Sequence, residues 1–401
     1  MLESIAIRRL ETEGRPLDIG LLAETLLFYG KIHLILDHGS LVSLLRTLGP
    51  DHLLYLLDNG LATGTYYRQT LGVSGQSHIY DFIGFEFAGS KDKGRIQGKR
   101  QIINHIFETA LSKSRATQRY ADRFLRSVSF EDMTSGFNHD NGIVGLARQD
   151  LDDDLYVKEA ISGALNELLP GFKIKQRWNF KIYRNESGFV FDTNLDFDAI
   201  NSEYHKRVPP EHSSITPAYL ATHLLQARAD ICLASASQSE FVTTPVSSRI
   251  IQIKFANILE KQFKSASEIQ LFQEVYIGNG RAIRESINSG EKTFAEFIEV
   301  LERSTKFKQW LNDREPNENL LREYHKAVTA DTWVDCLPTK GVRFTLFTGA
   351  GMLVDLVAPT GLGTAAGLAV SAGDTFILDK FLKGWKPNQF VEGPLTNFVK
   401  N

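Results

Sequence analysis

Four oxygen-bearing side chains at every second position are the residues whose spacing is most suggestive of chemistry: Asp192, Asn194, Asp196 and Asp198. This period of two predicts that they share one face of a strand, with apolar residues on the other face. Glu203 is the twelfth residue counted from Asp192, so the spacing partly resembles a calcium loop, but Phe197 stands where that loop needs glycine. We expect a solvated strand face, with metal binding as the alternative.

A run of aspartates stands directly before a predicted helix. The helix covers residues 154–169, and the run consists of Asp150, Asp152, Asp153 and Asp154. Carboxylates at this place can accept hydrogen bonds from the first backbone N–H groups and complement the helix dipole. We therefore expect a capping role, with a catalytic carboxylate cluster as the alternative.

The other residue types that do chemistry form no recognised motif. The ten histidines show no HExxH or HxH spacing, Cys232 and Cys336 lie outside any metal-ligand spacing, and no serine stands in a GxSxG elbow. The glycines of Gly361–Gly367 superficially match a dinucleotide fingerprint, but Pro359 interrupts the strand that should precede them. The sequence predicts no catalytic residue, cofactor site or metal ligand, while an enzyme site assembled from distant side chains stays open.

The segment Phe344–Leu378 is unusually apolar and rich in glycine, and Asp355 is its only charge before Asp374. It is predicted to form two short helices around a turn at Pro359. Each arm is shorter than the ~20 apolar residues that cross a bilayer, so the hairpin is either buried in the protein or re-entrant or interfacial at a membrane. Its candidate contacts with a membrane or a partner are Phe344, Phe347, Met352, Leu353, Leu356, Leu362, Leu368 and Trp385.

The elements of the first ninety residues follow from apolar periodicity and turn signals. Lys31–Asp37 is predicted as a buried strand, and Ser40 and Asp51 are expected to cap the two helices after it. Further strands are expected at Thr65–Thr70 and Ile79–Phe87. This part of the chain is therefore expected to be α/β.

Later parts of the chain change character twice. Residues from Lys91 onward are basic and helical in pattern; a solvated face beside a core face explains this, and phosphate or nucleic-acid binding is the alternative. Residues 172–198 alternate apolar and polar side chains around the turn Asn185–Gly188, which predicts a β-hairpin. After Pro209-Pro210 the pattern is helical to the end.

These elements predict a predominantly helical α+β fold. It would comprise an N-terminal α/β region at 1–90, a helical region at 91–170, a β-hairpin element at 171–212 and a helical C-terminal domain at 213–401 that contains the apolar hairpin 344–378. A chain of 401 residues is long enough for more than one core. The net charge of -3 gives no reason to expect broad affinity for nucleic acid, which stays a lesser alternative.

Several short stretches resemble a group of uncharacterised bacterial proteins, some of which are encoded in phage-defence loci. The stretches near the C-terminus are Lys306–Leu311, Thr332–Val334, Asp374–Lys380 and Gly384–Gly393, and those near the N-terminus are Leu22–Tyr29 and Leu34–Asp37. The resemblance assigns no chemical role to any residue. What it implies is an association with antiviral defence.

We accordingly expect a non-enzymatic component of a bacterial anti-phage defence system, which senses or binds a macromolecular partner and acts through the C-terminal hairpin. The expected partners are a second protein encoded nearby and a membrane surface. The alternative function is a hydrolase or nuclease with a site assembled from dispersed Asp, Glu and His residues. Because the sequence shows no secretory signal and its two cysteines are far apart, we expect a cytoplasmic protein, peripheral at the inner membrane if the hairpin acts there.

Overall fold

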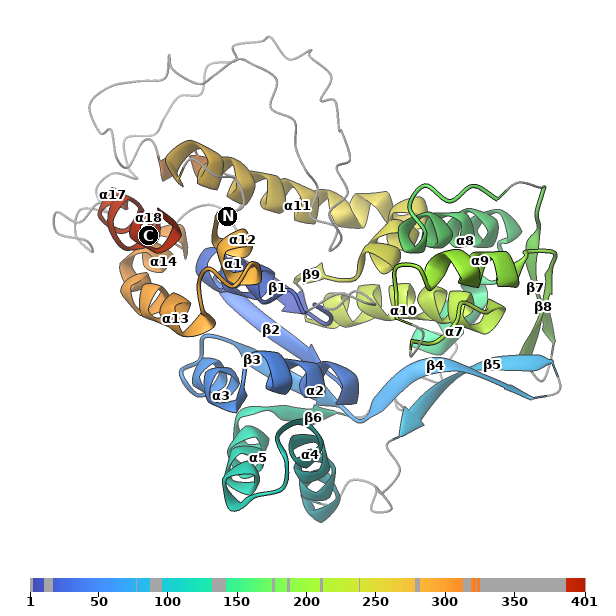
Figure 1. The fold of residues 1–401 in the computed structure, drawn as a ribbon, viewed down its shortest axis with the longest axis horizontal. Coiled ribbons are helices and arrows are strands. Elements are labelled where there is room, and N and C mark those ends of the chain that lie inside the picture. The colour runs from blue at the N-terminus through green and yellow to red at the C-terminus, as the bar shows by residue number, and fades with distance from the viewer. Residues whose placement is uncertain are drawn as a thin grey trace, which may run out of the picture.

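The computed structural model describes most of the chain and shows a predominantly helical α+β fold, which confirms the predicted fold class (Figure 1). The described residues are 3–10, 17–76, 78–86, 96–131, 142–174, 177–185, 188–209, 212–237, 239–277, 282–312, 319–321, 323–324 and 387–400.

A parallel sheet lies near the middle of the molecule (Figure 1). Its order is β6-β3-β2-β1-β9, and each neighbouring pair is parallel. The strands are β1 (Ser4–Ile7), β2 (Lys31–Leu36), β3 (Thr63–Tyr67), β6 (Ser129–Glu131) and β9 (Glu240–Val242). The buried strand predicted after Lys31 is confirmed as β2. In contrast, β9 lies in a part of the sequence that was expected to be helical, so that expectation was wrong at this point.

The first helices cover this sheet and are α1 (Ile19–Phe28), α2 (His38–Thr47) and α3 (Pro50–Asp58). Both predicted caps were wrong. Asp37 is the N-cap of α2 and Ser40 is the third helical residue, because the two form a reciprocal capping box. Helix α3 begins after Gly49 with Pro50 in its first turn, where a missing N–H does no harm.

A second, antiparallel sheet has the order β4-β5-β8-β7. Its strands are β4 (Gln69–Gln76), β5 (Ile79–Glu86), β7 (Phe180–Asn185) and β8 (Gly188–Thr193). The predicted hairpin is confirmed as β7 and β8, although β7 begins later than the alternation suggested. The strand expected at Thr65–Thr70 is divided at Arg68, because β3 belongs to the parallel sheet and β4 to the antiparallel one.

Two hydrophobic cores surround these sheets. The first contains α1 and the aromatic group Phe28, Phe272 and Phe307, and the second contains residues of α7 (Ile143–Asp150), α8 (Asp154–Leu168), α10 (Pro217–Ala236) and the start of α11 (Pro245–Ile277). Helix α10 packs along β4 and also contacts β9. It therefore connects the two sheets.

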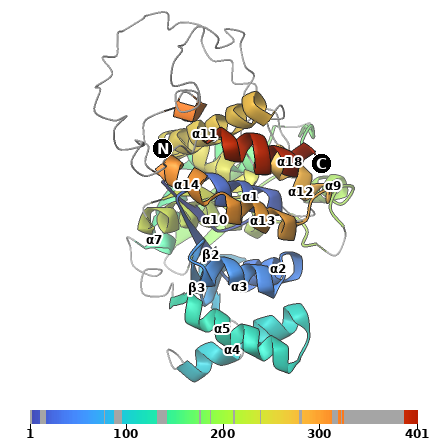
Figure 2. The ribbon, with the colours of Figure 1, turned by 90° about the vertical axis from the view of Figure 1, so that its left-hand side faces the viewer.

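The remaining helices complete the periphery. Helices α4 (Ile96–Leu111) and α5 (Arg115–Ser127) pack together at one end of the molecule (Figures 1 and 2). The others are α9 (Phe197–Tyr204), α12 (Ala282–Asn288), α13 (Phe294–Arg303), α14 (Thr305–Asn312), α17 (Asn388–Phe390), the π-helical turn η1 (Val391–Leu395) and α18 (Thr396–Lys400). In the ranges described above, no helix is both long and apolar enough to cross a bilayer.

Candidate functional site

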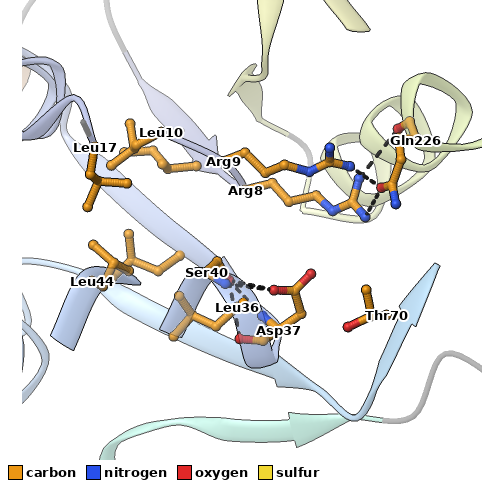
Figure 3. Close-up of a pocket in the computed structure, with 13 residues that line it drawn as sticks. Arg8, Arg9, Leu10, Leu17, Leu36, Asp37, Ser40, Leu44, Thr70 and Gln226 are labelled. Atoms are coloured by element: carbon orange, nitrogen blue, oxygen red, sulfur yellow. Dashed lines mark hydrogen bonds between the residues drawn. The ribbon is translucent and has the colours of Figure 1, made fainter. Parts of the chain in front are cut away.

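A cavity of about 230 Å³ lies at the carboxyl edge of the parallel sheet (Figure 3). Its polar lining consists of Arg8, Arg9, Asp37, Ser40, Thr70 and Gln226. Its other side is apolar, where Figure 3 shows Leu10, Leu17 and Leu44 gathered away from the charged groups. The cavity therefore offers a polar and an apolar wall to one small molecule.

The parallel sheet brings these side chains together. Arg8 and Arg9 follow β1 directly, Asp37 stands between β2 and α2, and Thr70 comes shortly after β3. Because parallel strands end at the same edge, residues far apart in sequence meet there. Ligands of open α/β sheets bind outside the carboxyl ends of the strands, close to the point where the strand order reverses. In this sheet the reversal lies between β1 and β9, next to the arginines.

Arg8 is almost fully buried, with 6% of its side chain exposed. Its guanidinium forms an ion pair with Asp230 and donates to the side-chain oxygen of Gln226 at 2.7 Å. Asp230 also accepts a hydrogen bond from the hydroxyl of Thr243, which follows β9, and the Gln226 amide donates to the carbonyl of Leu71 at 2.7 Å. A buried charge needs such compensation, and the network fixes the direction of Arg8.

Arg9 extends beside Arg8 towards the same residue of α10 (Figure 3). It donates to the Gln226 side-chain oxygen that Arg8 also contacts, so two guanidinium groups converge on one neutral amide. His223 lies one turn earlier on α10, and burial, followed by the charge of Arg9, lowers the pKa of His223 to about 3. At neutral pH His223 is therefore uncharged, and the arginines supply the positive charge at this place.

The first turn of α2 forms another wall of the cavity. The Asp37 carboxylate accepts from the backbone N–H and from the hydroxyl of Ser40, both at 2.9 Å, and Gly39 lines the cavity beside them. The start of a helix carries a partial positive charge, which favours an anion nearby. Burial, followed by the negative charge of Asp37, raises the pKa of Tyr66 well above its ordinary value, so this hydroxyl stays protonated.

The chemistry open to this cavity follows from its lining. Guanidinium, hydroxyl and helix N-terminal groups can hold an anionic group, and the leucines can hold an apolar body. Among the described residues that line the cavity, Asp37 is the one carboxylate, and it already serves α2 as a cap. No family model, curated protein or solved structure matches this chain. Its function therefore has to be inferred from the geometry of the site.

The predicted acidic strand face is confirmed for Asp192, which is exposed on β8, and was wrong for the other three residues. Strand β8 ends at Thr193, Asp196 is the N-cap of α9, and Asp198 lies in the first turn of that helix. Asn194 instead accepts a hydrogen bond from the backbone N–H of Asn179 at 2.7 Å. The chain therefore begins a helix where the alternation of polar residues had suggested a continuing strand.

The aspartate run before α8 has mixed roles. Asp153 caps α8 by accepting from the backbone N–H of Tyr156 at 3.0 Å, which confirms the expected capping role for that residue. Asp150 differs from the expectation, because it ends α7, is buried, and pairs with Arg228 at 2.5 Å and Lys254 at 3.0 Å.

Two other candidate sites were a metal site and the apolar hairpin. Within the described ranges, no group of three or more His, Cys, Asp or Glu side chains is placed to hold a metal ion. The apolar hairpin 344–378 lies outside the described residues, as do all of its candidate contacts: Phe344, Phe347, Met352, Leu353, Leu356, Leu362, Leu368 and Trp385. Its role stays a prediction.

The sequence reasoning missed the residues that build the cavity. A signal was present in the arginine pair Arg8-Arg9 directly after the apolar run Ile5–Ile7, because charge at the end of a buried strand is typical of a ligand site in α/β sheets. A second signal was the spacing of Gln226 and Asp230, which puts both on one face of a helix. Their approach to Arg8 could not be read from the sequence.

Proposed function

We propose that this chain binds a small anionic ligand with an apolar body in the cavity at the carboxyl edge of its parallel sheet. The observation that carries the proposal is the convergence of Arg8 and Arg9 on Gln226 inside a cavity whose other side is lined by leucines. Arginine suits this task because its planar guanidinium binds carboxylate and phosphate groups through paired hydrogen bonds.

The polar groups are held in place before a ligand arrives. Asp230 and Gln226 fix Arg8, and the capping box fixes Ser40 and Asp37. A site whose groups are already oriented loses less entropy on binding. A cavity of about 230 Å³ suits a small molecule better than a polymer.

Binding fits this geometry better than hydrolysis does. Glycoside hydrolysis by carboxylates uses two such groups around the substrate, whereas among the described lining residues the cavity holds Asp37, which is engaged as a helix cap. We therefore infer a sensing role for the chain. In bacterial anti-phage defence, which the sequence resemblance implies, the cavity would recognise a small molecule and other surfaces would meet the macromolecular partner.

The experiment compares phenyl phosphate, inorganic phosphate and phenol as probes in thermal unfolding of the full chain. Phenyl phosphate combines an anion with an apolar ring, so we expect it to raise the melting temperature more than either of the other two probes. A ligand present at one hundred times its Kd adds about 2.7 kcal/mol to the free energy of unfolding.

Two variants localise the effect and one controls for charge. Arg9→Gln removes a guanidinium and Leu44→Phe fills the apolar side, so each should abolish the extra shift with phenyl phosphate. Arg249→Gln removes an exposed charge on α11 and should leave the shift unchanged. An equal shift in all four proteins, or no shift with phenyl phosphate in the wild type, refutes the proposal.

A further inference from the structure

The α4–α5 helix pair is strongly basic in a protein that is acidic overall. Residues 96–127 contain seven Lys and Arg against two Asp and Glu, a net charge of +5, while the whole chain has a net charge of -3. The two helices pack together at one end of the molecule, next to the edge strand β6 (Figures 1 and 2). The positive charge is therefore concentrated at that end.

The arginines of α5 form a stripe, which consists of Arg115, Arg119, Arg123 and Arg126. At about 100° per residue these positions fall within an arc of about 80°, while the buried residues Thr117, Ala121 and Phe124 lie on the opposite side of the helix. All four arginines are exposed. With a rise of about 1.5 Å per residue, the stripe is about 16 Å long.

Within the described ranges, one of the four arginines of the stripe forms an ion pair. Arg123 forms an ion pair with Asp58 of α3, and the charge of Arg126 also acts on that carboxylate. Across the described part of the chain, Arg115 and Arg119 form no ion pair. One acidic residue, Asp122, lies at the border of the stripe, about 20° from Arg115, and it pairs with Arg100 of α4 at 2.7 Å. The stripe therefore keeps an excess of positive charge opposite the packed face of the helix.

We infer that the α5 arginine stripe binds the phosphate backbone of duplex DNA. Each strand of the duplex carries one phosphate per about 3.4 Å of its axis, so a 16 Å stripe spans about five phosphates. An α-helix fits the DNA major groove, which is about 12 Å wide, whereas the major groove of duplex RNA is too narrow for it. This inference is independent of the cavity and would supply the macromolecular partner.

The side chains around the stripe favour binding of duplex DNA over single-stranded DNA. Proteins that bind single strands stack the bases on aromatic rings. The aromatic residue on the exposed part of α5 is Tyr120, and its hydroxyl donates to Asp51 of α3 at 3.1 Å, which holds the ring against the protein. The stripe therefore offers charge without a stacking platform, and binding should not depend on base sequence.

The test measures fluorescence anisotropy of a labelled 24-base-pair DNA duplex with the full chain between 50 and 200 mM salt. If three arginines each release a counterion, affinity should fall about forty-fold across that range. The triple variant Arg115→Gln, Arg119→Gln and Arg126→Gln should lose most binding and most of the salt dependence. It leaves the Arg123–Asp58 ion pair intact.

A matched control removes the same charge elsewhere, through Lys173→Gln, Arg303→Gln and Lys306→Gln, all at exposed positions. It should bind as the wild type does, and a lysine version of the stripe variant should keep the salt dependence. Thermal unfolding verifies that each variant is folded. Equal binding by the stripe and control variants overturns the inference, as does tighter binding to a single strand, to duplex RNA or to vesicles of anionic lipid.

Discussion

The buried ion pair between Arg8 and Asp230 leads to a quantitative prediction about stability. Replacing Asp230 by Asn keeps the size of the side chain and removes its charge, so Arg8 stays charged with 6% of its side chain exposed. Removing one partner of a buried pair costs about 3–5 kcal/mol. We expect a loss of this size in the free energy of unfolding, constant between pH 5 and 7, because a guanidinium does not give up its proton in this range.

The reverse substitution, Arg8→Met, should behave differently because a carboxyl group can take up a proton. For a carboxyl group with an ordinary pKa of about 3.9, the free-energy cost of protonation is about 4 kcal/mol at pH 7 and about 1.5 kcal/mol at pH 5. We therefore expect the loss caused by Arg8→Met to be at most about 4 kcal/mol at pH 7 and to shrink by more than half at pH 5.

Urea unfolding followed by tryptophan fluorescence, to which the buried Trp310 contributes, measures both variants at the two pH values. The double variant Arg8→Met, Asp230→Leu completes the cycle and should recover most of the loss, because it buries no charge. A loss below about 1 kcal/mol for Asp230→Asn, or a loss for Arg8→Met that does not shrink in acid, would show that water reaches this pair and would refute the reasoning.

Three further predictions concern other buried positions. A Cβ at Gly20 would lie 2.3 Å from the backbone oxygen of Arg284, so Gly20→Ala should cost about 1–3 kcal/mol in urea unfolding. Burial lowers the pKa of Lys308 to about 8. Between this value and about 10.4 the unfolded chain binds more protons than the folded one, so the free energy of unfolding should rise with pH by up to about 3 kcal/mol. The variant Lys308→Met should not show this rise. Burial lowers the pKa of His223 to about 3, so stability should fall as the pH drops below about 6.5, by about 2 kcal/mol at pH 5, and His223→Phe should remove that loss.

For each of these predictions, one experimental result would contradict it. Gly393 has open space around its α-carbon, so Gly393→Ala is the control for Gly20→Ala, and equal effects would argue against a close approach of α1 and α12. Parallel pH profiles of the wild type and Lys308→Met would show that Lys308 is solvated. Likewise, an acid profile that His223→Phe leaves unchanged would show that His223 can be protonated in the folded state.

The parts of the fold that depend on local pattern could be predicted. Strand β2 corresponds to a largely apolar run, helix α8 ends at Leu168, just before Pro170-Gly171, and β8 of the predicted hairpin begins at Gly188, which has a positive φ of 146°. In each case a few neighbouring residues determine the backbone. The overall class, helical with small sheets, follows from the sum of such patterns.

The cavity depends on pairings between distant segments, which no local pattern records. Strand β9 has three residues between long helices, and it becomes a strand because β1 offers it a free edge. Arg8 is buried only because α10 brings Asp230 to it. The Asp192–Asp198 spacing failed for a related reason, since the capping preference of Asp196 began a helix where alternation suggested a strand.

The position of β9 in the sheet has a consequence for synthesis of the chain. Ile5 pairs with Glu240, so the outer edge of β1 has no neighbour until about 235 further residues have been translated. At 5–20 residues per second a ribosome needs roughly ten to fifty seconds for that length, and during this time the edge can pair with other nascent chains. Productive expression should therefore depend on holding chaperones, and fragments that stop before residue 240 should aggregate.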